Sequence, residues 1–289
     1  MISGGKVLLG RFREGSKRLL KTLLGRVLFG LGCHKLLLSG MGVVVEFHRV
    51  NDDRKPDAMN CGTEQFMAYC RFFKTYFAVV PLRSMVDKLE AGLPLGGELA
   101  ITFDDGYRDN AVNAAPILKE MDLHATFFVV SGFIGSTAVP YWDRMSGQTH
   151  SWMSEAELVG LQDAGFEVGS HSHTHADLGS IPMDQVREEL SRSRSSLESL
   201  LGRPPDLFAY PFGDPSNITP QAQREVRNAG YRCCASGFGG LNATGSDPFE
   251  LRRFAISVWY SSPYHLAGDI LAHALRSRIR PWLKRKANP

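Results

Sequence analysis

The sequence has no apolar run long enough to cross a bilayer, although 43% of its 289 residues are hydrophobic. A spanning helix needs about 18 to 20 consecutive apolar residues, and the segment 36–45 is interrupted by Ser39, Gly40 and Gly42. The first residues also lack the short basic region, uninterrupted apolar core and small-residue cleavage site of a signal peptide. We therefore expect a cytoplasmic protein.

Cysteine is scarce and irregularly spaced. The five cysteines are odd in number and form no C-x-x-C pair, so the sequence supports neither a disulfide framework nor a zinc site built from thiolates. We expect all of them to be reduced: Cys33, Cys61, Cys70, Cys233 and Cys234.

Acidic residues are nearly absent from both ends of the chain. Residues 1–40 contain eight Lys and Arg and one acid, Glu14, and residues 273–289 contain six and none. Removing these fourteen bases and one acid from the totals of 33 and 30 leaves 19 bases and 29 acids, so the middle carries a charge of about −10. Nucleic-acid binding is the weakest interpretation, because the body is acidic and the basic ends lack interleaved aromatic residues.

The segment 1–40 has a helical pattern of leucines with a basic face. Such a helix could lie flat on an anionic membrane. It could equally pack its leucines on the rest of the protein and expose its lysines. The sequence leaves both interpretations open.

From residue 43 onward, strand-like and helix-like segments alternate. The predicted strands cover residues 43–47, 78–80, 100–103, 126–130, 166–170, 207–210, 232–235 and 253–258. The predicted helices cover 63–76, 84–90, a segment through 117–118, 154–164, 183–201 and a segment ending at 228. Ser84 with Asp87 and Ser154 with Glu157 have the spacing of capping boxes. The alternation predicts an α/β fold with a mostly parallel sheet, open or closed into a barrel, whose chemistry gathers at the carboxyl ends of the strands.

Two adjacent carboxylates close the strand at residues 100–103, in the sequence Thr-Phe-Asp-Asp-Gly. Successive strand residues point to opposite faces, so Asp104 and Asp105 share a cavity only if the backbone bends there, as Gly106 permits. The alternative is an ordinary turn in which the aspartates cap the following helix.

Two histidines, His171 and His175, follow the strand at 166–170 and are spaced so that one turn of chain could bring both to one ion. Imidazole suits zinc and related metals, although such a pair can also be purely structural. We expect His173 to point elsewhere. Two histidines and one carboxylate would leave metal positions open for water and substrate, and the second carboxylate could take a proton from that water.

Together these motifs resemble the polysaccharide deacetylases, the family 4 carbohydrate esterases with the NodB homology domain. The similarity runs from about residue 43 to about residue 258. Besides the aspartate and histidine motifs, it includes the segments Glu46–Val50, Ala125–Val129, Phe208–Gly213 and Leu251–Phe254.

The resemblance implies that Asp104 is the general base and that Asp105, His171 and His175 bind a divalent metal, most commonly zinc, whose bound water is the nucleophile. It also implies that the backbone amide of Phe212 stabilises the oxyanion. The implied fold is a distorted, incomplete (β/α) barrel with mostly parallel strands. The implied reaction is the hydrolysis of an N-acetyl group from an amino sugar, which gives acetate and a free amine.

Two positions depart from the family's pattern. Many members have an arginine at the position of Ala209, where it supports the base, and Arg253 could take that role here. Many members also carry a late histidine that protonates the leaving amine. His273 is one candidate for this acid and His48 another, and the sequence does not decide between them.

The sequence thus divides into a basic amphipathic segment at 1–40, a catalytic domain at 41–262 and a basic C-terminal helix and tail at 263–289. The expected partner is an N-acetylated glycan, with peripheral contact between the basic ends and the inner face of a membrane as a further hypothesis. The alternatives are a glycan-binding protein of the same fold without turnover, and an amidohydrolase acting on a small non-sugar amide. Oligomeric state is not indicated.

Overall fold

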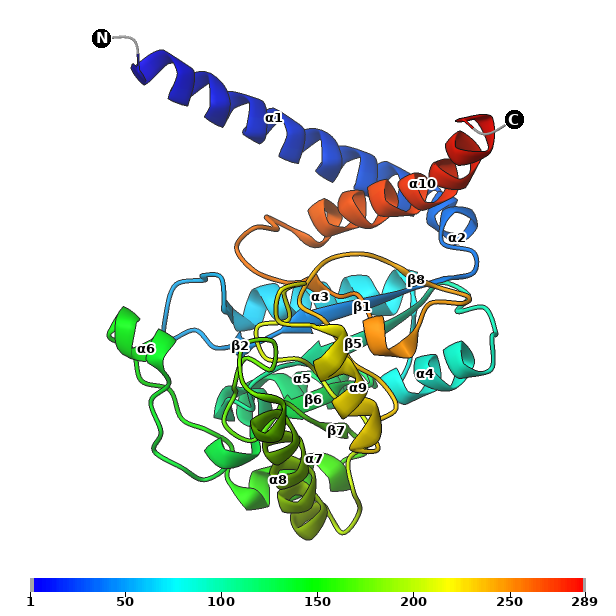
Figure 1. The fold of residues 1–289 in the computed structure, drawn as a ribbon. Helices are drawn as coiled ribbons and strands as arrows, with labels where there is room; N and C mark the ends of the chain where they lie inside the picture. The colour runs from blue at the N-terminus through cyan, green and yellow to red at the C-terminus, as the bar shows by residue number, and fades with distance from the viewer. Residues whose placement is uncertain (1–2, 288–289) are drawn as a thin grey trace. The chain divides into compact units, whose positions relative to one another are not determined.

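The computed structural model describes the backbone of residues 3–287 and the side-chain surroundings of residues 15–145 and 147–279. The chain forms two compact units, one of residues 40–258 and the other of both chain ends, up to residue 39 and from residue 259 (Figure 1). The sequence treated the two ends as separate segments, whereas the structure groups them in one unit because their helices pack together.

A mostly parallel sheet organises the unit of residues 40–258 (Figure 1). Its central order is β7-β6-β5-β1-β8, with β4 beside β5 and β9 beside β1, and every pairing is parallel except that of β8. The strands are β1 (Met41–Phe47), β4 (Ala78–Val79), β5 (Glu98–Phe103), β6 (Thr126–Val129), β7 (Glu167–Ser170), β8 (Asn242–Ala243) and β9 (Phe254–Ala255). A separate parallel pair joins β2 (Arg49–Val50) and β3 (Asn60–Cys61).

Beyond β7 the parallel pairing continues only as single bridges. Ser170 pairs with Phe208, Ala209 with Ala235, and Ala235 with Leu251, three residues before β9. The strands predicted at 207–210 and 232–235 are therefore reduced to isolated bridges. This irregular return towards β1 makes the sheet a distorted, incomplete barrel, which confirms the predicted fold class.

Helices connect the strands, and several follow the predicted bounds closely. They are α3 (Thr63–Tyr76), α4 (Leu82–Glu90), α5 (Ala115–Glu120), α6 (Tyr141–Ser146), α7 (Glu155–Asp163), α8 (Met183–Leu201) and α9 (Pro220–Asn228). A π-helical turn, Asn110–Ala114, precedes α5, and two 3-10 turns occupy Ser131–Phe133 and Pro248–Glu250.

The two predicted capping boxes had different outcomes. The box of Ser154 and Glu157 is present at the start of α7. The box of Ser84 and Asp87 was wrong, because α4 begins two residues earlier, after Pro81. The Glu167 carboxylate caps α4 instead, accepting a hydrogen bond from the Leu82 amide at 2.9 Å.

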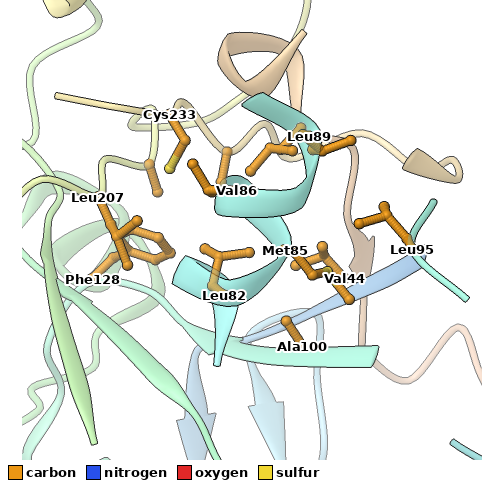
Figure 2. Close-up of a cluster of buried hydrophobic side chains, with 13 residues drawn as sticks. Val44, Leu82, Met85, Val86, Leu89, Leu95, Ala100, Phe128, Leu207 and Cys233 are labelled. Atoms are coloured by element: carbon orange, nitrogen blue, oxygen red, sulfur yellow. The ribbon is translucent and has the colours of Figure 1, made fainter. Parts of the chain in front are cut away.

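A cluster of buried apolar side chains packs α4 against the sheet (Figure 2). Leu82, Met85, Val86 and Leu89 of α4 contact a set of fully or almost fully buried residues: Val44, Leu95, Ala100, Phe128, Leu207, Ala209, Cys233, Ala235 and Leu251. Each large aliphatic side chain buried here contributes about 1.5 to 3 kcal/mol. The cluster therefore fixes β1, β5 and β6 relative to the irregular segments that follow β7.

Stacked phenylalanines hold the ends of three neighbouring strands in register. The Phe103 ring lies 5.4 Å from the Phe47 ring and 4.8 Å from the Phe127 ring, both in stacked geometry. Because neighbouring strand residues face opposite ways, anchoring Phe103 in the core directs the next residue, Asp104, towards the other face.

The unit of the chain ends contains α1 (Ser3–Gly30), α2 (Cys33–Leu37) and α10 (Pro263–Ala287). Two glycines let α1 and α10 approach closely: a Cβ on Gly25 would lie 2.2 Å from the Tyr264 carbonyl oxygen, and one on Gly268 would lie 2.3 Å from that of Lys21. Lys21 also forms an ion pair with Asp269 at 2.5 Å. Among the described helices, none combines the length and apolar character that crossing a membrane requires.

Candidate active site

The predicted site residues of the 40–258 unit line one cavity of about 350 Å³ at the carboxyl ends of β1, β5 and β7. Its described lining is Glu46, His48, Met59, Asp104, Asp105, Tyr141, Trp142, His171, His175, Tyr210, Phe212, Asp214, Gly237 and Arg253. A second cavity of about 500 Å³ is lined by other residues, including His150, and contains none of the predicted site residues. The smaller cavity is therefore the candidate site.

Asp105, His171 and His175 converge in this cavity. The Asp105 Oδ1 atom lies 3.4 Å from Nε2 of His171 and 3.3 Å from Nε2 of His175. One ligand atom from each residue lies within 4.8 Å of the other two. The bend that brings Asp105 here occurs at Asp105 itself, whose φ is +75°, with Gly106 following at +87°.

The hydrogen bonding of the three residues leaves their metal-facing atoms free. The two carboxylate oxygens of Asp105 are buried and have no hydrogen-bond partner among the described residues. The Nδ1–H of His171 donates to the Ala209 carbonyl at 2.8 Å, which leaves Nε2 as a lone-pair donor. A buried carboxylate without donors and two imidazoles with unshared nitrogens are a donor set that suits a divalent metal such as zinc.

The charge state of Asp105 agrees with this arrangement. Burial alone would raise its pKa, but His171 and His175 outweigh burial and hold that pKa well below the ordinary value. The carboxylate is therefore ionised, as a metal ligand must be.

Asp104 is paired with Arg253 by two parallel hydrogen bonds. Nη1 donates to Oδ1 at 2.7 Å and Nη2 donates to Oδ2 at 2.6 Å. The guanidinium is itself fixed, because its Nε donates to the Ser236 carbonyl at 2.6 Å and its Nη1 to Thr102 Oγ1 at 3.2 Å. Arg253 is 1% exposed. This pairing places a cation beside Asp104, the position that the sequence analysis considered for Arg253 in the absence of an arginine at Ala209.

The pair sets the ionisation of Asp104. Burial would raise its pKa, but the Arg253 guanidinium outweighs that effect and lowers the pKa below its ordinary value. Asp104 therefore carries a negative charge, and its Oδ2 lies 4.0 Å from Nε2 of His171. An ionised carboxylate beside the three-residue cluster can accept a proton from a water molecule bound there.

Sequence reasoning missed Glu46, a charged residue inside the apolar strand β1. It is 5% exposed, with Oε2 at 3.2 Å from Nη2 of Arg253 and Oε1 at 3.5 Å from Nε2 of His48. Burial raises the pKa of Glu46, against the opposing effect of Arg253. The signal that could have identified it was a single acid within the otherwise apolar sequence of β1.

Of the two candidate acids, His48 lines the cavity with a side chain 18% exposed. His273 belongs to α10, in the other unit. Only His48 is therefore part of the unit that contains the site. His173 turns away as expected, and its Nδ1 forms a hydrogen bond with Ser131 Oγ at 2.8 Å.

Phe212 lies in a tight turn at the cavity wall. Its φ is +63°, and among the described residues its amide donates to no backbone acceptor. The Phe212 ring lies 4.7 Å from the His175 ring, and the ring of Trp142, on α6, lies 4.6 Å from the His175 ring. The sequence analysis did not predict Trp142.

Comparison with known proteins identifies this unit. Residues 94–234 match the family model described as polysaccharide deacetylase. Over this range the chain is similar to the polysaccharide deacetylase family. The matched range includes Asp104, Asp105, His171, His175 and Phe212, whereas Glu46, His48 and Arg253 lie outside it. The resemblance noted in the sequence is thus confirmed.

Individual polysaccharide deacetylase relatives are distant. The chain is 25% identical over 157 residues to the protein YxkH of Bacillus subtilis (strain 168), covering 54% of this chain and 50% of that protein. It is 24% identical over 157 residues to the peptidoglycan-N-acetylmuramic acid deacetylase PdaA of the same organism, covering 52% of each. The chain therefore spans about half the length of these curated relatives.

Solved structures support the fold. The Streptococcus pyogenes deacetylase PplD in complex with acetate aligns with a TM-score of 0.65 and 19% identity, covering 78% of this chain and 96% of that chain. At this identity the likeness is one of fold.

Proposed function

We propose that the protein is a hydrolase that removes N-acetyl groups from an amino-sugar-containing glycan and requires a divalent metal, with zinc as the expected ion. The observation that carries this proposal is the Asp104–Arg253 pair beside the convergent Asp105, His171 and His175 in one cavity. The family match supports the hydrolytic deacetylation, and the name of the relative PdaA supports an N-acetylated sugar as the substrate class.

Asp105, His171 and His175 would hold the ion. When bound there, a divalent ion polarises the acetyl carbonyl and makes a coordinated water more acidic. Asp104, kept ionised by Arg253, accepts the proton as the water oxygen attacks the carbonyl carbon. The Phe212 amide donates a hydrogen bond to the oxygen on which negative charge develops.

The amine must then leave with a proton. His48 is the residue we assign to this step, because it lines the cavity and its Nε2 lies 3.5 Å from Glu46. The new carbon–oxygen bond replaces the carbon–nitrogen bond, and the products are acetate and a free amine on the sugar. Trp142 and Phe212 form an aromatic wall that suits the apolar face of a sugar ring.

Two other functions were open from the sequence. Binding without turnover rested on the missing arginine at Ala209 and on the undecided general acid. The Arg253 pairing and the position of His48 in the cavity support turnover instead. Hydrolysis of a small non-sugar amide would use the same side chains. This alternative is distinguished from glycan deacetylation by which substrates the protein cleaves. The test is acetate release from N-acetylglucosamine oligomers compared with simple acetamides. We expect release from the oligomers; release from simple amides alone would instead favour the amidohydrolase.

A further inference from the structure

Helix α1 has two opposite faces within the unit of the chain ends. One face is covered by α10 and includes Gly25, which is buried, and Lys21, which pairs with Asp269. Six large apolar side chains are 48% to 72% exposed: Leu19, Leu20, Leu23, Leu24, Val27 and Leu31. At 3.6 residues per turn, these six side chains fall within about 140° of arc around the helix, and Gly25 lies on the opposite side. The helix therefore presents an apolar face, defined by these six residues, that α10 does not cover.

Basic residues flank this apolar face. By the same helical geometry, the exposed Lys17 and Arg26 lie at its two margins. Residues 15–39 and 259–279 together contain seven Lys and Arg and a single acid, Asp269, which is occupied by Lys21. An apolar centre with basic margins is the pattern of a helix that lies in a membrane interface.

We propose that the unit of the chain ends docks on the surface of an anionic phospholipid bilayer, with the apolar face of α1 inserted among the acyl chains and Lys17 and Arg26 at the headgroups. The helix lies flat, since no described helix meets the requirements for spanning a membrane. The proposal is independent of the proposed activity. The cytoplasmic location expected from the sequence stays a prediction.

Charge and apolar matching favour lipid over protein occupants. A second copy of this unit would bring two strongly basic surfaces together with few acids to neutralise them, at a cost in repulsion. The described part of the 40–258 unit offers no comparable run of apolar side chains on one element. Its exposed large apolar residues are scattered, and no element carries more than the two on α6, Tyr141 and Met145; the others are Leu93, Val112, Phe212 and Val258. An anionic bilayer supplies both the apolar layer and the negative charge.

The test is sedimentation of the full chain with vesicles of phosphatidylcholine alone and of equal parts phosphatidylcholine and phosphatidylglycerol. We expect binding to the anionic vesicles that weakens as salt is raised, because salt screens the headgroup attraction. The double variant Leu20→Ser, Leu24→Ser should lower the partition coefficient by about tenfold or more, since each 1.4 kcal/mol of lost burial is a factor of ten. Lys17→Gln with Arg26→Gln should weaken binding to anionic vesicles and leave the residual binding to neutral ones unchanged.

Matched controls exist in the other unit. Leu93→Ser changes a leucine that is 52% exposed, and Lys119→Gln with Arg224→Gln removes two exposed cations. Both controls should bind vesicles like the wild type, and circular dichroism should show unchanged helix content in every variant. Three outcomes would overturn the proposal: no binding to anionic vesicles, binding that the α1 leucine variant leaves intact, or self-association that the same variant abolishes in the absence of lipid.

Discussion

Arg253 and Asp104 are 149 residues apart in the sequence and meet through two parallel hydrogen bonds of 2.6 and 2.7 Å in a buried cavity. Asp104 directly follows β5 and Arg253 directly precedes β9, so the pair links these two strands. It also keeps the candidate base ionised. Its removal should therefore affect folding and activity in ways that can be separated.

Replacing Arg253 with methionine should destabilise the fold by about 3 to 5 kcal/mol, because it leaves the Asp104 charge buried without its partner. Arg253→Lys keeps the charge but loses the paired geometry, so we expect a folded protein with strongly reduced acetate release. Urea unfolding and acetate assays measure the two effects. The exposed neighbour Arg252→Lys is the control and should behave like the wild type; an Arg253→Lys variant with full activity would contradict the positioning role.

His48→Gln should lower kcat for N-acetyl sugars by about a hundredfold, a typical loss for a general acid. An activated acetanilide, whose amine needs little protonation to leave, should lose much less. His273→Gln is the comparison and should change neither rate. Equal losses for both substrates would show that His48 has a structural role instead.

Metal removal should destabilise the wild type. A ligand at 100 times its Kd adds about 2.7 kcal/mol to stability, so zinc should raise Tm and a chelator should lower it. Asp105→Asn removes one ligand charge and should abolish the zinc-dependent shift, whereas the exposed Asp163→Asn on α7 should keep it. The same Tm with and without metal in the wild type would count against the metal site.

Gly213→Ala should be destabilising for two reasons. Gly213 has φ +68°, and an added Cβ would lie 2.2 Å from the Gly237 amide nitrogen. Gly245 has φ +83° but open space around such a Cβ, so Gly245→Ala isolates the backbone strain, about 1 to 2 kcal/mol. We expect Gly213→Ala to lose about 1 to 3 kcal/mol more. It should also slow acetate release, since it displaces the adjacent Phe212 amide.

Stability should fall in acid partly through His150, which is outside the candidate site. Burial and the neighbouring Arg49 and Arg54 lower the pKa of His150 from 6.5 to about 4. The unfolded chain therefore binds a proton at His150 more readily than the folded chain does. The contribution of His150 to the free energy of unfolding is complete above pH 6.5 and declines as the pH falls towards 4. His150→Gln should remove about 1 to 2 kcal/mol of the loss between pH 7.5 and 5. Urea midpoints for both proteins at each pH test this, and parallel pH dependences would contradict it.

The sequence predicted that the main residues of the candidate site lie together because local patterns indicate it. Asp104 and Asp105 follow an apolar strand, and His171 and His175 follow another, so a parallel sheet brings them to one edge. Arg253 was predicted only by asking which cation could replace the one missing at Ala209.

What the sequence did not predict depends on contacts distant in the chain. Glu167 sets the start of α4 from another strand, so the local Ser84 spacing was misleading. Glu46 and Trp142 join the cavity only once β1 and α6 are placed around it. The segments 207–210 and 232–235 have strand-like composition, but the irregular closure of the barrel allows them only single bridges.

The central claim is that Asp104 acts as an ionised base beside an ion held by Asp105, His171 and His175. The most direct measurement is acetate release from N-acetylglucosamine oligomers, with metal content determined on the same samples of wild type and Asp104→Asn. The account predicts one bound metal in both proteins and a loss of at least about a hundredfold in the rate of the variant. Metal-loaded wild type that releases no acetate, or an Asp104→Asn variant as fast as the wild type, would contradict it.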